Sequence, residues 1–269
     1  MIERWLARLS SSPYASQFVL KGGVLLAALG QRRPTVDADA LAIGLTNDAE
    51  TVAARVAEIA AVEDGEDGVE FLTATVSAQL IRDHALYHGV RVTMDARLAT
   101  ATVKLHLDIN FGDPVNPAPQ RVSLPGLRPA SAPIEVLGYP VETVLAEKIT
   151  TAIDLGEANT RVRDLVDIYT VTGSHAIRRA PMHDALLATA EFRGVEPVAL
   201  SAAIGDLANL RRGDYRAYRE ALGRFGEHLP DDLGDAIAAA TAFADPMITG
   251  VDAPNAMWDP DTRCWTTSR

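Results

Sequence analysis

The sequence has few cysteines, few basic residues and no long apolar run. Its 269 residues include a single cysteine, so no internal disulfide can form, which favours a reducing compartment. Lysine and arginine total 25 against 36 acidic residues. The formal net charge of -11 excludes a general positive field that would attract nucleic acid. Any acidic partner must therefore be bound by a local group of basic residues.

Signals for export and for membrane insertion are also lacking. No basic and apolar leader follows Met1. No apolar run approaches the roughly 18 residues that are typical of a membrane-spanning helix. We therefore expect a cytoplasmic protein without a membrane partner. The length allows one large domain or two smaller ones, and we favour two.

The hydrophobic patterns predict an α+β protein whose first part mixes helices and strands and whose second part is helical. In the first part we expect helices at 2–9, 14–29 and 47–61, and strands at 35–43, 69–76, 90–98 and 103–111. In the second part we expect helices at 140–155, 161–171, 180–191, 197–210, 215–226 and 231–243.

A proline-rich stretch, Pro114 to Pro133, lies between the two parts and is the expected connection. We therefore place one domain at residues 1–133 and a helical lobe at 134–269. The tail after Pro246 shows no periodicity, and its tryptophans, Trp258 and Trp265, are expected to pack on the rest of the protein.

Acidic side chains interrupt two strands that are otherwise apolar. Alternation places Asp37 and Asp39 on one face of the expected strand 35–43, and Asp108 on the polar face of the strand 103–111. Carboxylates on neighbouring strands repel one another unless a cation lies among them. Hard oxygen ligands of this kind suit Mg²⁺, so the pattern predicts a magnesium site. A single Asp-x-Asp, taken alone, is better explained as a polar strand end.

Two adjacent glycines, Gly22 and Gly23, precede these acids. We place them at a start or a break of the expected helix 14–29, where exposed backbone amides can meet a phosphate. Tight packing of a helix against the sheet explains the pair equally well.

A lysine lies in the middle of an apolar helix face in the second part. Lys148 is flanked at helical spacing by apolar residues such as Leu145 and Ala152. Lysine is rare in such a position unless it is paired or reaches into a cleft. Asp164, in the next helix, interrupts an apolar surface in the same way and can pair with Lys148. Asp167 is a second candidate partner.

Five segments of the chain resemble the AbiEii family of nucleotidyltransferase-like toxins, which includes the MenT toxins of mycobacteria. The segments are "LKGGVLL", "RPTVDADAL", "LHLDINFGD", "YPVETVLAEKITTAI" and "RVRDLVDIY", in the order found in the family. Each segment alone is weak evidence, whereas the five together are specific.

The resemblance implies a polymerase-beta-like nucleotidyltransferase core followed by a helical lobe. Some family members transfer nucleotides from an NTP to the 3′ end of tRNA and are restrained by an AbiEi-type antitoxin. By this likeness Asp37 and Asp39 bind the metal, Asp108 acts as metal ligand or general base, and Lys148 with Asp164 completes the catalytic set. Candidate substrate-binding residues are Gly22, Gly23, Lys21, Arg33, Thr35, Arg161 and Asp167.

The sequence departs from the family at Val24, where serine or threonine is usual. Loss of the hydroxyl removes one donor to a phosphate, typically worth about 1 kcal/mol. Two alternatives to a tRNA-modifying toxin stay open, one because of the net charge of -11 and the other because of Val24. The first is transfer of a nucleotide to a protein or small-molecule hydroxyl, and the second is a non-catalytic nucleotide-binding or partner-binding protein.

Overall fold

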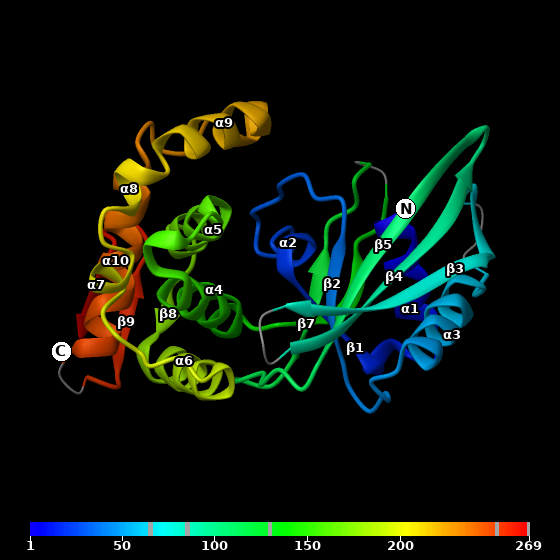
Figure 1. The fold of residues 1–269 in the computed structure, drawn as a ribbon, viewed down its shortest axis with the longest axis horizontal. Coiled ribbons are helices and arrows are strands. Elements are labelled where there is room, and N and C mark those ends of the chain that lie inside the picture. Colours follow the sequence, from blue (N-terminus) through cyan, green and yellow to red (C-terminus); the bar gives the residue numbers. More distant parts are fainter. Residues whose placement is uncertain (64–66, 84–86, 129–130, 251–252, 268–269) are drawn as a thin grey trace. The chain divides into compact units, whose positions relative to one another are not determined.

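The computed structural model describes residues 1–63, 67–83, 87–128, 131–250 and 253–267, and the chain forms two compact units (Figure 1). Unit 1 comprises residues 1–113 and 119–139, and unit 2 comprises residues 114–118 and 140–269. The chain therefore passes between the units three times, at 113/114, 118/119 and 139/140. The sequence predicts one boundary, at 133/134, with Pro114 to Pro133 as the connection.

Unit 1 is built on a mixed sheet of seven strands with the order β3-β4-β5-β2-β1-β7-β6. The strands are β1 (Phe18–Lys21), β2 (Ala38–Ala42), β3 (Val69–Asp83), β4 (Tyr87–Leu98), β5 (Ala101–Phe111), β6 (Gln120–Leu124) and β7 (Ile134–Gly138). The pairs β1–β7 and β2–β5 are parallel, and the other neighbours are antiparallel. The proline-rich stretch thus contributes β6 to the sheet instead of serving only as a connection.

Helices α1 (Ile2–Ser11) and α3 (Ala49–Ala60) contribute the apolar core beside this sheet. Trp5 of α1 is buried, packs edge-on against Phe18 of β1, and donates a hydrogen bond from Nε1 to the carbonyl of Val56 in α3. Small residues of β2, Ala38 and Ala40, line the same apolar hollow as Trp5. The large indole therefore packs where the strand carries only methyl groups, which keeps the interior dense.

The first glycine of the pair begins a helix, and the expected helix 14–29 is wrong. The segment contains a 3₁₀ turn at Ala15–Gln17, then β1, and then the short helix α2 (Gly22–Leu25). All four residues of β1 are buried, because the strand lies between β2 and β7. A short apolar run buried on both faces has no strand alternation, so its periodicity does not separate it from a helix.

The cap of α3 (Asp48) lies one residue after Asn47, the residue at which the sequence places the start of the helix. Asp48, not Asn47, caps the helix, and its carboxylate accepts the backbone N–H groups of Glu50 and Thr51 at 3.1 Å each. Asparagine and aspartate are comparably good caps, so the sequence does not choose between adjacent positions.

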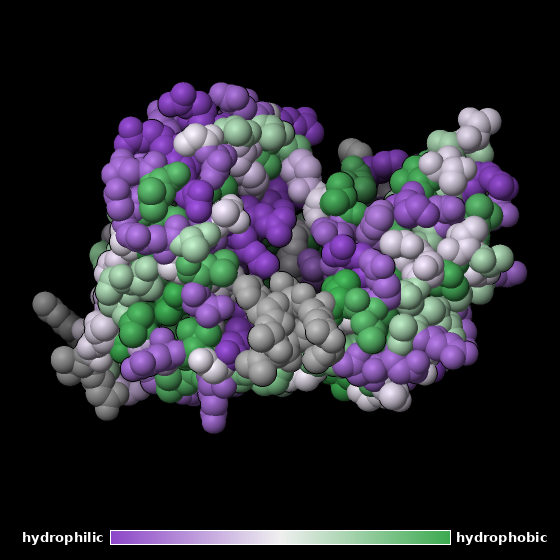
Figure 2. Space-filling view, in the orientation of Figure 1, coloured by the Kyte–Doolittle hydropathy of each residue, from purple (hydrophilic) through white to green (hydrophobic). Residues whose placement is uncertain are grey.

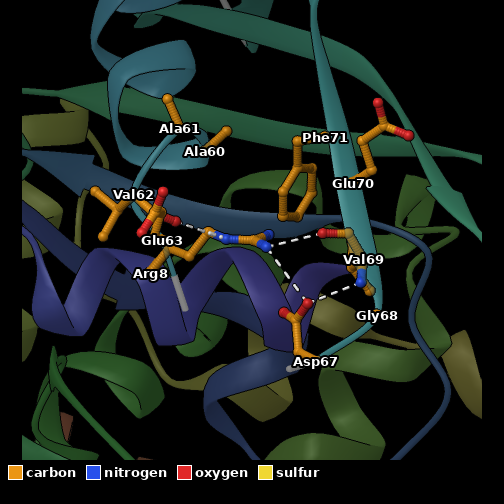
Figure 3. A pocket seen from close by; sticks show the side chains of 10 residues that line it. All are labelled: Arg8, Ala60, Ala61, Val62, Glu63, Asp67, Gly68, Val69, Glu70 and Phe71. Atoms are coloured by element: carbon orange, nitrogen blue, oxygen red, sulfur yellow. Dashed lines mark hydrogen bonds and ion pairs between the residues drawn. The ribbon is translucent and has the colours of Figure 1, made fainter. Parts of the chain in front are cut away.

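A hollow of about 560 Å³ opens beside α3 and the start of β3 (Figure 3). Arg8 lies in the wall of this hollow, where it is buried over the ring of Phe71. Its guanidinium donates hydrogen bonds to the carbonyls of Val62 and Val69 and to the carboxylate of Asp67. These bonds tie α1 to the segment around β3. The hollow shares no lining residue with the site predicted from the sequence, so we assign Arg8 a structural role.

Unit 2 is mainly helical, as expected. Its helices are α4 (Val141–Leu155), α5 (Val162–Thr172), α6 (Arg179–Arg193), α7 (Leu200–Ile204), α8 (Leu207–Leu210), α9 (Arg212–Leu222) and α10 (Leu233–Thr249), with 3₁₀ turns at Gly156–Ala158 and Gly223–Gly226. The helix expected at 197–210 is divided into α7 and α8 by Gly205, whose φ of +48° interrupts the helical backbone. The surface over α8 and α9 is mostly hydrophilic on the face seen in Figure 2.

The tail of unit 2 packs as expected and adds strands that the sequence pattern did not predict. A three-stranded sheet joins β8 (Ile177–Arg178), β9 (Ala256–Asp259) and β10 (Cys264–Thr267). Trp258 and Trp265 both pack against Phe243 of α10, and Trp258 Nε1 donates to the carbonyl of Thr172 at 2.7 Å. Among the described residues, no helix is long and apolar enough to cross a membrane.

Candidate active site

Four charged residues form one row across the sheet of unit 1, and we call them the charged row. Lys21 of β1 is the register partner of Asp39 of β2. Asp39 pairs with Asp108 of β5, and Asp108 pairs with Arg91 of β4. Because directly opposed residues project to the same face of a sheet, the two acids lie side by side between two cations.

The face of the sheet that carries the charged row is opposite to the face that packs on α1. Ala38 and Ala40, which flank Asp39 in β2, line an apolar hollow together with Leu107 and Ile109, which flank Asp108 in β5. Trp5 and other apolar residues of α1 complete that hollow. Strand alternation therefore turns Asp39 and Asp108 away from the core. The sequence prediction that these acids occupy neighbouring strands agrees with the register.

The glycine pair brings the backbone against Asp39. Gly22 has a φ of +66°, and a Cβ atom built on it would lie 2.0 Å from Asp39 Oδ2. A Cβ on Gly23 would lie 3.2 Å from both terminal nitrogens of Arg33. Only glycine fits the turn between β1 and α2 while the carboxylate of Asp39 keeps its place. Val24, the departure from the family pattern, is half-buried in α2.

Asp37 lies just before β2, because the strand begins at Ala38 and not at Thr35 as expected. The hydroxyl of Thr35 donates to Asp37 Oδ1 at 2.9 Å and so orients the carboxylate. The negative charges of Asp37 and Asp39 both contribute to raising the pKa of Arg91, although less than Asp108 does. All three acids therefore act on one guanidinium, and Asp37 lies electrostatically close to the charged row.

Asp108 forms a two-pronged ion pair with Arg91. The Nε and Nη2 atoms of Arg91 donate to Asp108 Oδ1 and Oδ2 at 2.8 and 2.6 Å. Hydrogen bonding to Asp108, followed by its charge, raises the pKa of Arg91 and keeps it protonated. Both oxygens of Asp108 are therefore engaged. Arg91 was missed in the sequence, because the register between β4 and β5 cannot be obtained from alternation alone.

The donor atoms at Asp37 and Asp39 fit a divalent cation. Mg²⁺ is commonly held by one or two carboxylates together with water and substrate phosphates, and Gly22 places no Cβ atom against Asp39 Oδ2. Within the described ranges, no three His, Cys, Asp or Glu side chains gather as ligands of one ion. The third expected ligand, Asp108, accepts one hydrogen bond from Arg91 on each of its oxygens.

Lys21 is held by a residue that the sequence analysis did not select. Its Nζ atom lies 2.6 Å from Asp113 Oδ2, and both side chains are buried. The ring of Tyr139 lies under the ammonium group at 5.2 Å, and its hydroxyl donates to Asp113 Oδ2 at 3.4 Å. Asp113 follows the end of β5, beyond the alternating pattern that drew attention to Asp108. We interpret Asp113 as a positioning residue for the end of β1.

In unit 2, Lys148 of α4 pairs with two acids of α5. Its Nζ donates to Asp164 Oδ1 at 2.9 Å and to Asp167 Oδ2 at 2.7 Å, and all three side chains are largely buried. Burial alone would lower the pKa of Lys148, but Asp167 and Asp164 outweigh it and raise the pKa. Lys148 is therefore a permanent cation. The expected pairing with Asp164 is confirmed, and Asp167 proves to be an equal partner.

Burial would raise the pKa of Asp164, but Lys148 outweighs it, with help from Arg163 and Arg161, so the pKa is lowered. Arg161 thus lies close enough to add positive charge at the start of α5. The acids Asp37, Asp39 and Asp108 belong to unit 1, whereas Lys148, Asp164 and Asp167 belong to unit 2. Their convergence on one metal ion and one nucleotide stays a prediction.

Solved structures from two bacteria resemble this chain in fold. A protein of H. pylori, solved as a candidate nucleotidyltransferase, shares 16% identity, covers 91% of each chain and superposes with a TM-score of 0.51. MenT4, a nucleotidyltransferase toxin from Mycobacterium tuberculosis H37Rv, shares 18% identity, covers 89% of this chain and 90% of its own, and gives a TM-score of 0.46. No curated protein sequence matches the chain. The H. pylori structure therefore shows a similar fold over most of both chains.

The family profile described as "Nucleotidyl transferase AbiEii toxin, Type IV TA system" matches residues 4–245. Since the match covers most of the chain, the protein belongs to the AbiEii family of nucleotidyltransferase toxins. Membership implies an NTP substrate, a divalent metal in the general case, and an antitoxin partner. The resemblance of the five sequence segments to this family is confirmed.

Proposed function

We propose that the protein is a Mg²⁺-dependent toxin that transfers nucleotides from an NTP to the 3′ end of tRNA and thereby blocks translation. The observation that carries the proposal is the charged row, in which Asp39 and Asp108 lie side by side on β2 and β5 with Gly22 against Asp39. Carboxylates on adjacent strands beside a glycine turn suit the binding of a metal-bound triphosphate.

A divalent ion would neutralise phosphate charge and align the triphosphate for in-line attack. Asp37 and Asp39 would hold it, with Thr35 fixing the orientation of the Asp37 carboxylate. The small surface of Gly22 and Gly23 would let the phosphates approach the backbone. In this assignment Lys21 and Arg33 add positive charge around the same turn.

Lys148 would supply a cation to the phosphates, with Asp164 and Asp167 fixing its position. The raised pKa of Lys148 supports this role, because a lysine that stays protonated cannot serve as a general base. Arg161 would contact the phosphates or the RNA backbone from the start of α5. Transition-state charge stabilisation of this kind accounts for a large share of phosphoryl-transfer catalysis.

Incubation with labelled NTP, Mg²⁺ and total tRNA, followed by sequencing of tRNA 3′ ends, tests the proposal. We expect label on RNA in the wild type and a loss of at least about 100-fold in Asp37→Ala, because a principal metal ligand is removed. Growth inhibition on expression in a host cell should vanish in the same variant.

With a different acceptor, the label would appear on another molecule than tRNA. The transfer of label would still depend on Asp37. The net charge of -11 keeps a protein or small-molecule hydroxyl in view as the acceptor. Label on protein with none on tRNA would replace the tRNA assignment and retain the nucleotidyltransferase. If Asp37→Ala transferred nucleotides as fast as the wild type, Asp37 would not be a metal ligand.

A further inference from the structure

The Arg91–Asp108 pair has one fixed end and one end that can move. Asp108 belongs to β5 in the middle of the sheet, and its side chain is 12% exposed, whereas the Arg91 side chain is 42% exposed. Two parallel bonds of 2.8 and 2.6 Å join them. The carboxylate is therefore held by the strand, while the guanidinium can swing into solvent on its flexible stem.

Arg91 pairs with the carboxylate that the proposed function assigns as a third metal ligand or a base. Asp108 lies directly beside Asp39 in the register of β2 and β5. A forked guanidinium takes the two oxygens that face it, and its charge repels a dication brought to the same carboxylate. Asp108 can therefore serve Arg91 or a divalent ion, but not both at once.

The neighbouring acids strengthen the hold on Arg91. Hydrogen bonding and charge from Asp108, and then the charges of Asp37 and Asp39, raise the pKa of Arg91. A guanidinium thus neutralises part of a carboxylate cluster that would otherwise be repulsive. When a divalent ion neutralises the same cluster, the attraction that holds Arg91 is weakened.

We propose that Arg91 competes with the divalent cation for Asp108, so that the Arg91–Asp108 pair must open before Asp108 can act as a metal ligand or a base. The inference rests on the proposed function, in which Asp37, Asp39 and Asp108 form the metal centre. In this inference Arg91 is a positioning residue, and its pairing with Asp108 determines the cation concentration that is needed to fill the metal site.

The test measures cation binding without substrate. Mn²⁺ is added to the full chain without nucleotide, and the free ion is followed by its electron paramagnetic resonance signal. We expect Arg91→Ala to reach half-saturation at an Mn²⁺ concentration about fivefold lower than the wild type, the gain that corresponds to an exposed ion pair of about 1 kcal/mol. Arg91→Gln, which keeps most of the side-chain volume, should show the same direction and replaces the alanine variant if that variant does not fold.

Two comparisons separate competition from a general effect of charge. Arg97, on the same strand β4, pairs with Glu70 at 2.9 Å, and Arg97→Ala removes an equal charge from a different ion pair. It should leave Mn²⁺ affinity unchanged. In an Asp108→Asn background Arg91→Ala should lose most of its effect on Mn²⁺ affinity, because position 108 no longer carries a carboxylate that Arg91 could release.

Each outcome bears on the proposal. Unchanged or weaker Mn²⁺ binding in both Arg91 variants would overturn the competition and leave the metal centre intact. The same gain in the Asp108→Asn background would also overturn it, since the gain would then come from the field of the remaining acids. If Asp39→Asn bound Mn²⁺ as tightly as the wild type does, the proposed metal centre would be wrong. The inference about Arg91 would then be wrong as well.

Discussion

The backbone at Gly22 lies directly against the carboxylate of Asp39. Its φ of +66° is unfavourable for other residues, and a Cβ atom would fall 2.0 Å from Asp39 Oδ2. Asp39 cannot retreat along the sheet, because its strand is paired on both sides with β1 and β5. Any side chain at position 22 therefore displaces the Asp39 carboxylate.

We predict that Gly22→Ala lowers nucleotide transfer by at least about 100-fold while lowering the free energy of unfolding by only about 1–3 kcal/mol. The loss of activity exceeds the loss of stability because the proposed function makes the displaced carboxylate of Asp39 a metal ligand. Steady-state transfer assays and urea unfolding measure the two effects on the same protein.

Gly30 provides the matched control, since it has a φ of +74° and open space around its Cβ position. Gly30→Ala should show a similar backbone penalty in urea and nearly normal transfer. Equal losses of activity in the two variants would assign the effect to backbone strain and remove the special role of Gly22.

At the scale of single residues, alternation in the sequence was enough to predict that Asp39 and Asp108 project from the polar face of their strands. It was not enough for Asp37, which lies before the strand, or for Asp113, which lies after one. Arg91 was also missed, because a partner across the sheet is determined by register. Register depends on the pairing of distant segments, which a local pattern does not contain.

At the scale of elements, Lys148 holds α4 and α5 together through two buried carboxylates. In the wild type the pKa of Asp164 is lowered, so its contribution to stability is present above the unfolded pKa of about 3.8 and is lost as the pH falls through the folded pKa. The pair should therefore leave stability unchanged between about pH 7 and pH 5.

We predict that Lys148→Met lowers the free energy of unfolding by about 3–5 kcal/mol at pH 7, because two buried carboxylates lose their cation. Without that cation, burial raises the pKa of Asp164 above the unfolded value. The folded state then binds more protons, so the stability of the variant should rise as the pH falls from 7 to 5.

Urea unfolding at both pH values measures this inversion. Lys148→Met combined with Asp164→Asn and Asp167→Asn should recover part of the stability and lose the pH dependence. A single variant whose stability stayed flat from pH 7 to pH 5 would show that the acids rehydrate, contrary to the prediction.

Helices α4 and α5 of unit 2 were predicted to within one residue at each end, because each has an apolar face. The strand β1 was mistaken for a helix, because its residues are buried on every side. Gly205 was not recognised as a break, since a glycine inside a helical pattern is often tolerated. Local patterns thus succeed for half-buried elements and fail for fully buried ones.

At the scale of the whole molecule, the three passages of the chain between the units determine where it can be cut. Strand β7 pairs with β1 on one side and β6 on the other. The boundary expected after Pro133 would separate β7 from the sheet, whereas the compact unit continues to Tyr139. The prolines indicate where the connecting region lies. They do not show that part of this region, β6, is a strand of the sheet.

We predict that a fragment of residues 1–139 unfolds cooperatively, and that a fragment of residues 1–133 aggregates or stays largely unfolded. The shorter fragment leaves β1 with an open edge and β6 without a partner. Thermal circular dichroism and the dispersion of amide signals in nuclear magnetic resonance spectra distinguish the two. Equal stability of the fragments would mean that β7 is dispensable to the sheet.

The three tryptophans are divided between the units in a way that is useful for optical work. Trp5 lies buried in unit 1, while Trp258 and Trp265 pack against Phe243 in unit 2. Replacing Trp5 by phenylalanine would leave an emission signal that comes only from unit 2, and replacing the other two would isolate unit 1. The protein thus carries its own fluorophores for following each unit separately during ligand titrations or melting.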